Sequence, residues 1–139
     1  MRYVAPMSLI DDIDPSILAN TIATVATLGE SGDPQLTAVW FAVEDGKVIV
    51  SAKASRKKTK NLAADGRTSV LIFHPDTPDY YVEIRGTAEV LDDSDYVVAD
   101  RIAKRYNADF RSFDGPNDRR TIISVTAERV LVTDVRSEG

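Results

Sequence analysis

The sequence predicts a mainly-β or α+β domain built on a small antiparallel barrel, with six to seven strands, a crossover helix and one further helix. Residues 80–90 alternate between apolar and polar side chains, the period-two pattern of a strand with one buried face. Asp45-Gly46 separates two runs rich in β-branched residues and is a strong hairpin signal. No linker interrupts the chain, so residues 1–139 are predicted to form a single domain.

The first half of the chain is predicted to form one short helix followed by three strands. Asp14 and Pro15 supply a helix cap and a first helical position, and this helix is expected to end near Ala19. The strands are expected over 21–28, 35–43 and 47–52. Because a turn separates the first two strands and the hairpin joins the last two, we expect the three to pair in meander order.

The second half is predicted to combine strands with two helices. Ser55 is placed to cap a basic helix, which Gly66 is expected to end in the left-handed conformation. Gly86 interrupts the apolar face of its strand and predicts a bend or bulge. Acidic residues begin an amphipathic helix expected over 94–106. The remaining strands are expected over 68–74, 80–90, 121–126 and 129–134.

Composition argues against several classes of protein. The net charge of −5 argues against a general nucleic-acid binder, because phosphate backbones attract broad positive surfaces. No apolar run approaches the roughly 20 residues needed to span a bilayer. The acidic N-terminal segment lacks a signal-peptide pattern, and the chain has no cysteine. These observations predict a cytoplasmic protein without nucleic-acid or membrane partners.

The sequence contains no motif of side-chain catalysis. The nucleophile-elbow pattern, the phosphate-binding glycine loops and metal-ligand spacings are all absent. The single histidine, His74, ends a strand, and we expect it to make one hydrogen bond there. We therefore predict no metal site and leave the catalytic residues unassigned. A bound cofactor could supply the chemistry of such a protein.

The strongest functional signal lies in the stretch 51–62, which follows a predicted strand and enters the basic helix. Arg56, Lys57, Lys58 and Lys60 crowd the first turn of that helix, where the helix dipole disfavours cations. Free backbone N–H groups, hydroxyls and several cations together make an anion site, above all for phosphate. A solvated basic face is the alternative, but the position after a strand in an acidic chain favours phosphate.

Four further residues leave two interpretations open. Trp40 and Phe41 point to opposite faces of their predicted strand, so one is expected in the core. The other could stack on a flat ligand or on a second subunit. Glu83 and Arg85 share one strand face, so they either pair within the sheet or lie at a subunit interface.

The order of these segments resembles a known family. T-V-A-T-L-G-x-x-G-x-P-Q-L-T-x-V-W-F precedes the Asp-Gly hairpin, S-x-x-x-S-R-K-K-T-K-N-L-x-x-D-G-R-x-S-V-L-I follows it, and Y-x-x-I-R-G-T-A-E-V closes the stretch. The chain thereby resembles the flavin- and deazaflavin-dependent split β-barrel proteins related to pyridoxamine 5′-phosphate oxidase. The resemblance implies an FMN-binding type of split β-barrel, a homodimer, and a cofactor in each of two grooves between the subunits.

The resemblance also implies which residues bind the cofactor. The segment 51–61 would hold the phosphate, with Arg56 and Lys58 as the main cations. The stretch 35–40 would run along the ring system, and the Tyr80-Tyr81 pair would approach from the partner chain. The predicted cofactor-binding residues are Ser51, Arg56, Lys57, Lys58, Thr59, Asn61, Gln35, Thr37, Val39, Trp40 and Tyr81.

Two features select a branch of this family. Pyridoxamine phosphate oxidases carry a C-terminal Arg-x-His motif, but residues 132–139 contain no histidine, which argues against that activity. The pattern A-S-R-K-K-T-K-N-L is similar to the branch that uses coenzyme F420, whose acidic tail could pair with Lys53, Lys57 and Lys60. We therefore predict an F420-dependent oxidoreductase that transfers a hydride to or from a small organic substrate. An FMN-dependent oxidoreductase and a non-catalytic F420- or flavin-binding protein are the alternatives.

Overall fold

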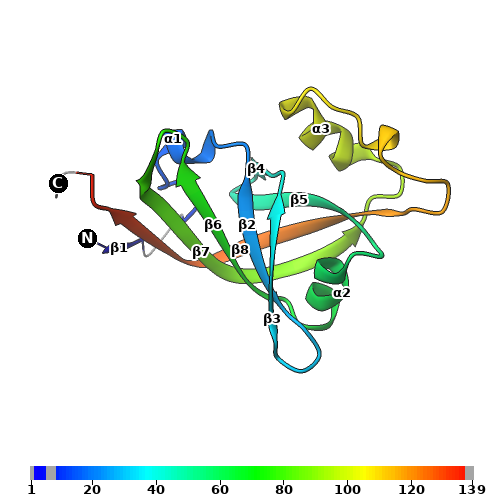
Figure 1. Cartoon of the computed structure of the whole chain (residues 1–139), viewed down its shortest axis with the longest axis horizontal. Helices are drawn as coiled ribbons and strands as arrows, with labels where there is room; N and C mark the ends of the chain where they lie inside the picture. Colours follow the sequence, from blue (N-terminus) through cyan, green and yellow to red (C-terminus); the bar gives the residue numbers. More distant parts are fainter. Residues whose placement is uncertain (1, 6–8, 137–139) are drawn as a thin grey trace.

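The computed structural model describes residues 2–5 and 9–136, which form one antiparallel sheet with short helices around it (Figure 1). The strands are β1 (Arg2–Ala5), β2 (Ala23–Leu28), β3 (Pro34–Val39), β4 (Ala42–Glu44), β5 (Lys47–Lys53), β6 (Arg67–His74), β7 (Thr77–Asp92) and β8 (Arg120–Asp134). The helices are α1 (Pro15–Leu18), α2 (Lys57–Ala64), α3 (Val97–Arg105) and the 3-10 turn η1 (Phe110–Ser112).

The sheet runs in the order β3-β2-β6-β7-β8-β5-β4, and β1 pairs with β8 outside this path. It curls around one large apolar core, and burying these side chains is the main favourable term in folding. Fully buried members of this core include Val25, Phe41, Val50, Val70, Ile84 and Val125. A smaller cluster packs α3 against β5 through Ile49, Ala99 and Ile102. The mainly-β prediction is confirmed.

Strand β7 shows the predicted alternation. Tyr80 and Val82 are buried, whereas Arg85 on the other face is exposed. The predicted bulge at Gly86 is confirmed, because the pairing with β8 shifts register between Arg85 and Gly86. A Cβ on Gly86 would lie 2.0 Å from the Thr126 carbonyl oxygen, so no other residue fits this close approach without movement of the backbone.

The chain changes from one edge of the sheet to the other at Trp40 and Phe41. The strand predicted over 35–43 is two strands, because β3 pairs with β2 at one end of the sheet and β4 pairs with β5 at the other. The predicted meander is therefore wrong, although the Asp-Gly hairpin between β4 and β5 is confirmed. The Tyr106 hydroxyl fixes the change of direction: it accepts from the Phe41 N–H at 2.9 Å and donates to the Phe41 carbonyl at 3.0 Å.

The two closing strands predicted over 121–126 and 129–134 are one continuous strand, β8. Gly86 pairs with Ala127 and Arg85 with Arg129, so Glu128 is the extra residue of the bulge. A polar break in the sequence marks this bulge and not the end of a strand. β8 also pairs with β5 and β1, which makes it the most connected strand of the sheet.

The first two helices confirm some predicted ends and correct others. Asp14 caps α1 as predicted, since its carboxylate accepts from the Ser16 N–H at 2.9 Å. The predicted Ser55 cap of α2 is wrong, because the cap position is Arg56 and no side chain bonds the helix end there. Gly66 does not adopt the predicted left-handed conformation. Instead it allows close packing on β7, where a Cβ would lie 2.7 Å from a carbonyl oxygen.

Helix α3 begins at Val97, later than the predicted 94. The buried Asp93 carboxylate takes the place of a normal cap and accepts from the N–H groups of Val98 at 3.1 Å and Ala99 at 2.8 Å. No helix in the described part of the chain is long and apolar enough to cross a membrane.

Candidate functional site

An open cleft of about 360 Å³ lies where the ends of β3 and β5 meet the start of α2 and the loop after α3. It brings together five of the residues predicted to bind a cofactor: Val39, Trp40, Ser51, Arg56 and Lys58. The volume is at the lower end of the range for small-molecule sites. These residues lie far apart in the sequence, so the fold creates the site.

The α2 side of the cleft carries uncompensated positive charge. Arg56 and Lys58 form no ion pair with any other described residue. Burial of the Lys58 ammonium, and then the nearby charges of Arg56 and Arg120, lower the pKa of Lys58. A half-buried lysine among other cations is electrostatically unfavourable without an anion. This end of the cleft is therefore suited to a phosphate or another anionic group.

The opposite side of the cleft is aromatic. Trp40 stacks on Tyr106 with ring centroids 4.5 Å apart and an interplanar angle of 6°. Phe110 lies 5.6 Å and Phe113 6.4 Å from the Trp40 ring, and Phe113 is 60% exposed. Phe41, by contrast, is fully buried, so the prediction that one of this pair lies in the core is confirmed, and stacking of Trp40 on a ligand stays a prediction. The two phenylalanines belong to the loop that follows α3.

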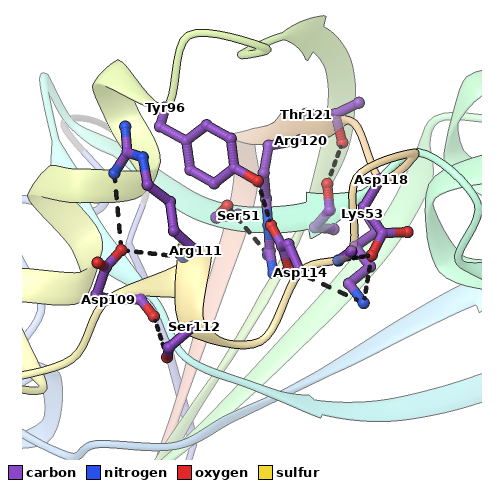
Figure 2. Close-up of polar contacts among 12 residues, drawn as sticks. Ser51, Lys53, Tyr96, Asp109, Arg111, Ser112, Asp114, Asp118, Arg120 and Thr121 are labelled. Carbon is purple, nitrogen blue, oxygen red and sulfur yellow. Dashed lines mark hydrogen bonds and ion pairs between the residues drawn. The ribbon is translucent and has the colours of Figure 1, made fainter.

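A buried ion pair anchors this loop beneath the cleft (Figure 2). Arg120, at the start of β8, donates from Nε to one Asp114 oxygen at 2.7 Å and from Nη2 to the other at 2.6 Å. The Asp114 side chain is 2% exposed and also accepts from the Tyr96 hydroxyl at 2.6 Å. The hydrogen bonds from Arg120 and Tyr96 hold the pKa of Asp114 below its ordinary value, although burial acts in the opposite direction.

Three predicted cofactor-binding residues lie outside the cleft lining and bond within the chain. The Thr59 hydroxyl donates to the Lys53 carbonyl at 2.8 Å. The Asn61 amide donates to the Thr27 hydroxyl at 3.0 Å and to Gln35 at 3.3 Å. These bonds tie α2 to β5 and to the β2–β3 hairpin. They place Thr59, Asn61 and Gln35 as supports of the basic helix, and their predicted direct contacts with a cofactor stay a prediction.

The other three predicted residues lie further away. Lys57 borders a separate hollow on the other side of α2, together with Lys60 and the turn after β2. Thr37 lies opposite Val25 in the β2–β3 ladder. Tyr81 packs against Phe73, with ring centroids 5.2 Å apart, on the outer face of the sheet. One chain therefore does not bring these three residues into the cleft.

The structure shows ion-pair partners for three charged residues that the sequence analysis singled out. Lys53, named as a possible counter-charge for the acidic tail of F420, lies 3.1 Å from Asp118 and 3.9 Å from Asp114, and its pairing with such a tail stays a prediction. Arg85 donates to Glu83 at 2.9 Å, so these two pair on their strand face.

His74 makes the expected strand-end hydrogen bond, accepting from the Asp76 N–H at 3.1 Å. The described residues contain no group of three or more histidines and carboxylates that could hold a metal ion.

Sequence reasoning missed Phe110, Phe113, Asp114 and Arg120 as parts of the cleft. They fall in the polar, turn-rich stretch 107–120, where the sequence indicates a helical turn near 109–113 and no part of a site. Phe110 and Phe113 were the available signal, because two large apolar side chains three residues apart in a polar loop usually pack against something. Arg120 gave no local signal, since its contact with the cleft depends on β8 pairing with β5.

Fold and cleft together define a split β-barrel with a cationic site beside an aromatic wall. The chain belongs to the pyridoxamine 5′-phosphate oxidase family, whose model matches residues 9–134. This confirms the resemblance on which the fold prediction rested.

Solved structures of related proteins agree with this assignment. An F420 reductase is similar, with a TM-score of 0.72 and 27% identity over 83% of this chain and 93% of that one. A conserved hypothetical protein from Mycobacterium tuberculosis has a TM-score of 0.72 and 30% identity, over 88% of this chain and 82% of that one. General Stress Protein 26 from Bacillus anthracis has a TM-score of 0.64 and 17% identity, over 86% of this chain and 89% of that one. At this identity the similarity shows a common fold alone.

Proposed function

We propose that this protein is an F420-dependent oxidoreductase that transfers a hydride between the deazaflavin and a small organic substrate. The observation that carries the proposal is the pair of cations Arg56 and Lys58, which form no ion pair with a described residue, beside the aromatic wall at Trp40. A ligand with an anionic group and a flat ring system fits both ends of such a cleft. Similarity to an F420 reductase at 27% identity supports the choice of cofactor.

Each part of the cleft has a role in this proposal. Arg56 and Lys58 would hold the phosphate, Ser51 would add a hydrogen bond, and Val39 and Trp40 would lie along the ring. The bound cofactor would supply hydride transfer, a reaction that the side chains of the cleft do not provide. The protein would bind and orient the two reactants and exclude water from between them.

We also propose that the protein acts as a homodimer whose second copy covers the outer face of β2, β3, β6 and β7. This face carries apolar side chains that solvent does not favour: Leu36 is 71% exposed and Phe73 is 38% exposed. Ala38 lies on the outer face of β3 and also lines the cleft. A second copy on this face would therefore border the cleft, and its Tyr81 could reach the site that Tyr81 of the same chain does not.

The decisive experiment is parallel titration of the cofactor-free protein with F420 and with FMN, followed by absorbance or fluorescence. Tight binding of F420 with weak binding of FMN is the expected result. The reverse would make the protein an FMN-dependent oxidoreductase. Tight F420 binding without turnover across a broad panel of reducible compounds would favour a non-catalytic carrier. Binding of neither cofactor would overturn the proposal.

Lys58→Ala tests the phosphate contact within this titration. Loss of one charge-assisted hydrogen bond, worth about 1.5–3 kcal/mol, should weaken F420 binding by roughly tenfold or more. Lys47→Ala is the matched control, because Lys47 is an exposed lysine at the hairpin end of β5. Equal affinities for both variants and the wild type would mean that the phosphate binds elsewhere.

Leu36→Arg tests the proposed dimer face. An arginine there would place an unpaired charge in an apolar contact, so light scattering after size exclusion should show a monomer. Val97→Arg is the control, since Val97 is 59% exposed on α3, away from the proposed dimer face. A dimer that persists in Leu36→Arg would exclude this face.

A further inference from the structure

One edge of the Arg120 guanidinium is bonded to Asp114, and the other edge carries N–H donors that Asp114 does not use. Its guanidinium carries five N–H donors, and the two bonds to Asp114 use Nε and Nη2. Among the described residues, Nη1 has only a long contact of 3.4 Å with the Ser51 hydroxyl, at the margin of a hydrogen bond. Arg120 is 5% exposed and yet lines the cleft. The side of the guanidinium that turns away from Asp114 therefore lies beside Ser51 (Figure 2).

The surroundings keep this guanidinium in one orientation. The Phe110 ring lies against it, with the guanidinium carbon 4.2 Å from the ring centroid. A planar fork that is fixed by a bidentate partner loses little entropy when it binds an additional acceptor. The Arg120 charge also acts on the cleft despite Asp114, because it contributes to the lowered pKa of Lys58. Arg120 is thus prepared to donate to an oxygen near Ser51 and Lys58.

We propose that Arg120 is a third cationic ligand-binding residue of the cleft, beside Arg56 and Lys58, that its Nη1 donates to an anionic oxygen bound near Ser51, and that Asp114 is its positioning residue. The inference rests on the proposed function only in that the cleft binds an anion. It adds a fixed donor from β8 to the cations of α2. The ligand group it fits is a phosphate or a carboxylate with oxygens facing two sides of the cleft.

The test removes both charges of the ion pair by combining Asp114→Asn with Arg120→Gln in one double variant. This double variant leaves the net charge of the protein unchanged and leaves no buried charge without a partner, so the fold is expected to persist. The matched control is Asp92→Asn with Arg119→Gln. Arg119 is the neighbouring arginine, and its pair with Asp92, 3.1 Å apart, is exposed and outside the cleft. Circular dichroism and thermal unfolding identify folded samples.

The probe is inorganic phosphate, followed by chemical-shift changes in two-dimensional NMR spectra, with F420 and FMN titrated in parallel. We expect the double variant at Arg120 to bind phosphate roughly tenfold more weakly than the wild type or worse, and the control at Arg119 to bind it normally. Unchanged phosphate affinity in a folded Arg120 variant would overturn the inference. A wild-type protein that gives no shifts at phosphate well above millimolar concentration would also overturn it.

The same data separate this inference from the proposed function. If the wild type binds phosphate through Arg120 but neither F420 nor FMN, the proposed cofactor is wrong and the inference holds. If the Arg120 variant binds phosphate and F420 as tightly as the wild type, the proposed function holds and Arg120 has only a structural role. If the double variant does not fold, Arg120→Lys replaces it, with Arg119→Lys as its control and the same expected loss.

Discussion

Helices α2 and α3 both carry arginine or lysine side chains, but they handle this charge differently. On α3, Arg101 pairs with Glu44 at 2.9 Å, and Arg105 donates to the carbonyls of Phe41, Leu18 and Asn20, each at 2.6 Å. The cations of α2 that line the cleft have no such partners among the described residues. Charge that stabilises a fold is neutralised by the fold itself, whereas charge left unpaired in a cleft is available to a ligand.

The largest effect is expected from Asp114→Ala, which breaks a buried ion pair outside both helices. Removing one partner of a buried pair leaves the Arg120 charge uncompensated, and we expect a loss of about 3–5 kcal/mol in the free energy of unfolding. Urea denaturation followed by tryptophan fluorescence measures this loss. Asp118→Ala is the control, since the Asp118 side chain is more exposed, pairs with Lys53 and accepts from the Gly115 N–H at 2.7 Å, and so breaks a more exposed ion pair of the same loop. A loss below about 1 kcal/mol would show that the pair does not anchor the loop.

Arg105→Lys tests how much the paired charge of α3 contributes to stability, and its expected effect is smaller. A lysine keeps the charge but cannot donate to three carbonyls from a planar fork, so we expect a loss of about 1.5 kcal/mol in the free energy of unfolding. Lys104→Arg, one residue earlier on the same helix, is the matched control with an expected change near zero. Equal stabilities for both variants would contradict the structural role given to Arg105.

Lys58→Met tests the cost of the unpaired charge at the start of α2. It removes a half-buried charge from the first turn of α2, and we expect the free energy of unfolding without ligand to rise by about 0.3–1 kcal/mol. Anion binding should weaken in the same variant. Thermal unfolding with and without phosphate measures both effects. A variant that is less stable than the wild type without ligand would mean that Lys58 has a stabilising partner in the free protein.

The pH dependence of ligand binding gives the smallest expected effect. Burial and neighbouring cations lower the pKa of Lys58 in the free protein, and a bound anion should raise it. Anion affinity is therefore highest below the free-state pKa and falls as pH rises through it. Lys58→Arg should remove this dependence, because arginine does not lose its proton in this range. Isothermal titration at several alkaline pH values measures this dependence. A slope that persists in Lys58→Arg would contradict the assignment to Lys58.

The sequence predicted those features whose causes are local. The alternation of β7, its bulge at Gly86 and the basic turn of α2 each depend on neighbouring residues alone. The change of sheet edge at Trp40 and Phe41 was missed, because β-branched and aromatic residues suit one long strand as well as two short ones. The same limit applies to Arg120, which meets Ser51 across 69 positions of sequence. No periodicity or motif records such a contact.

The position of β8 has a consequence for how the protein is made in the cell. The strand is the last of the sheet to leave the ribosome, yet it lies between β7 and β5 and also pairs with β1 near the start of the chain. A nascent chain that lacks residues 120–134 leaves β1 without a partner and leaves one edge of β5 and one edge of β7 unpaired, and such edges are prone to aggregation. The sheet can close only after synthesis of this strand, so a chain stalled before it needs protection by chaperones.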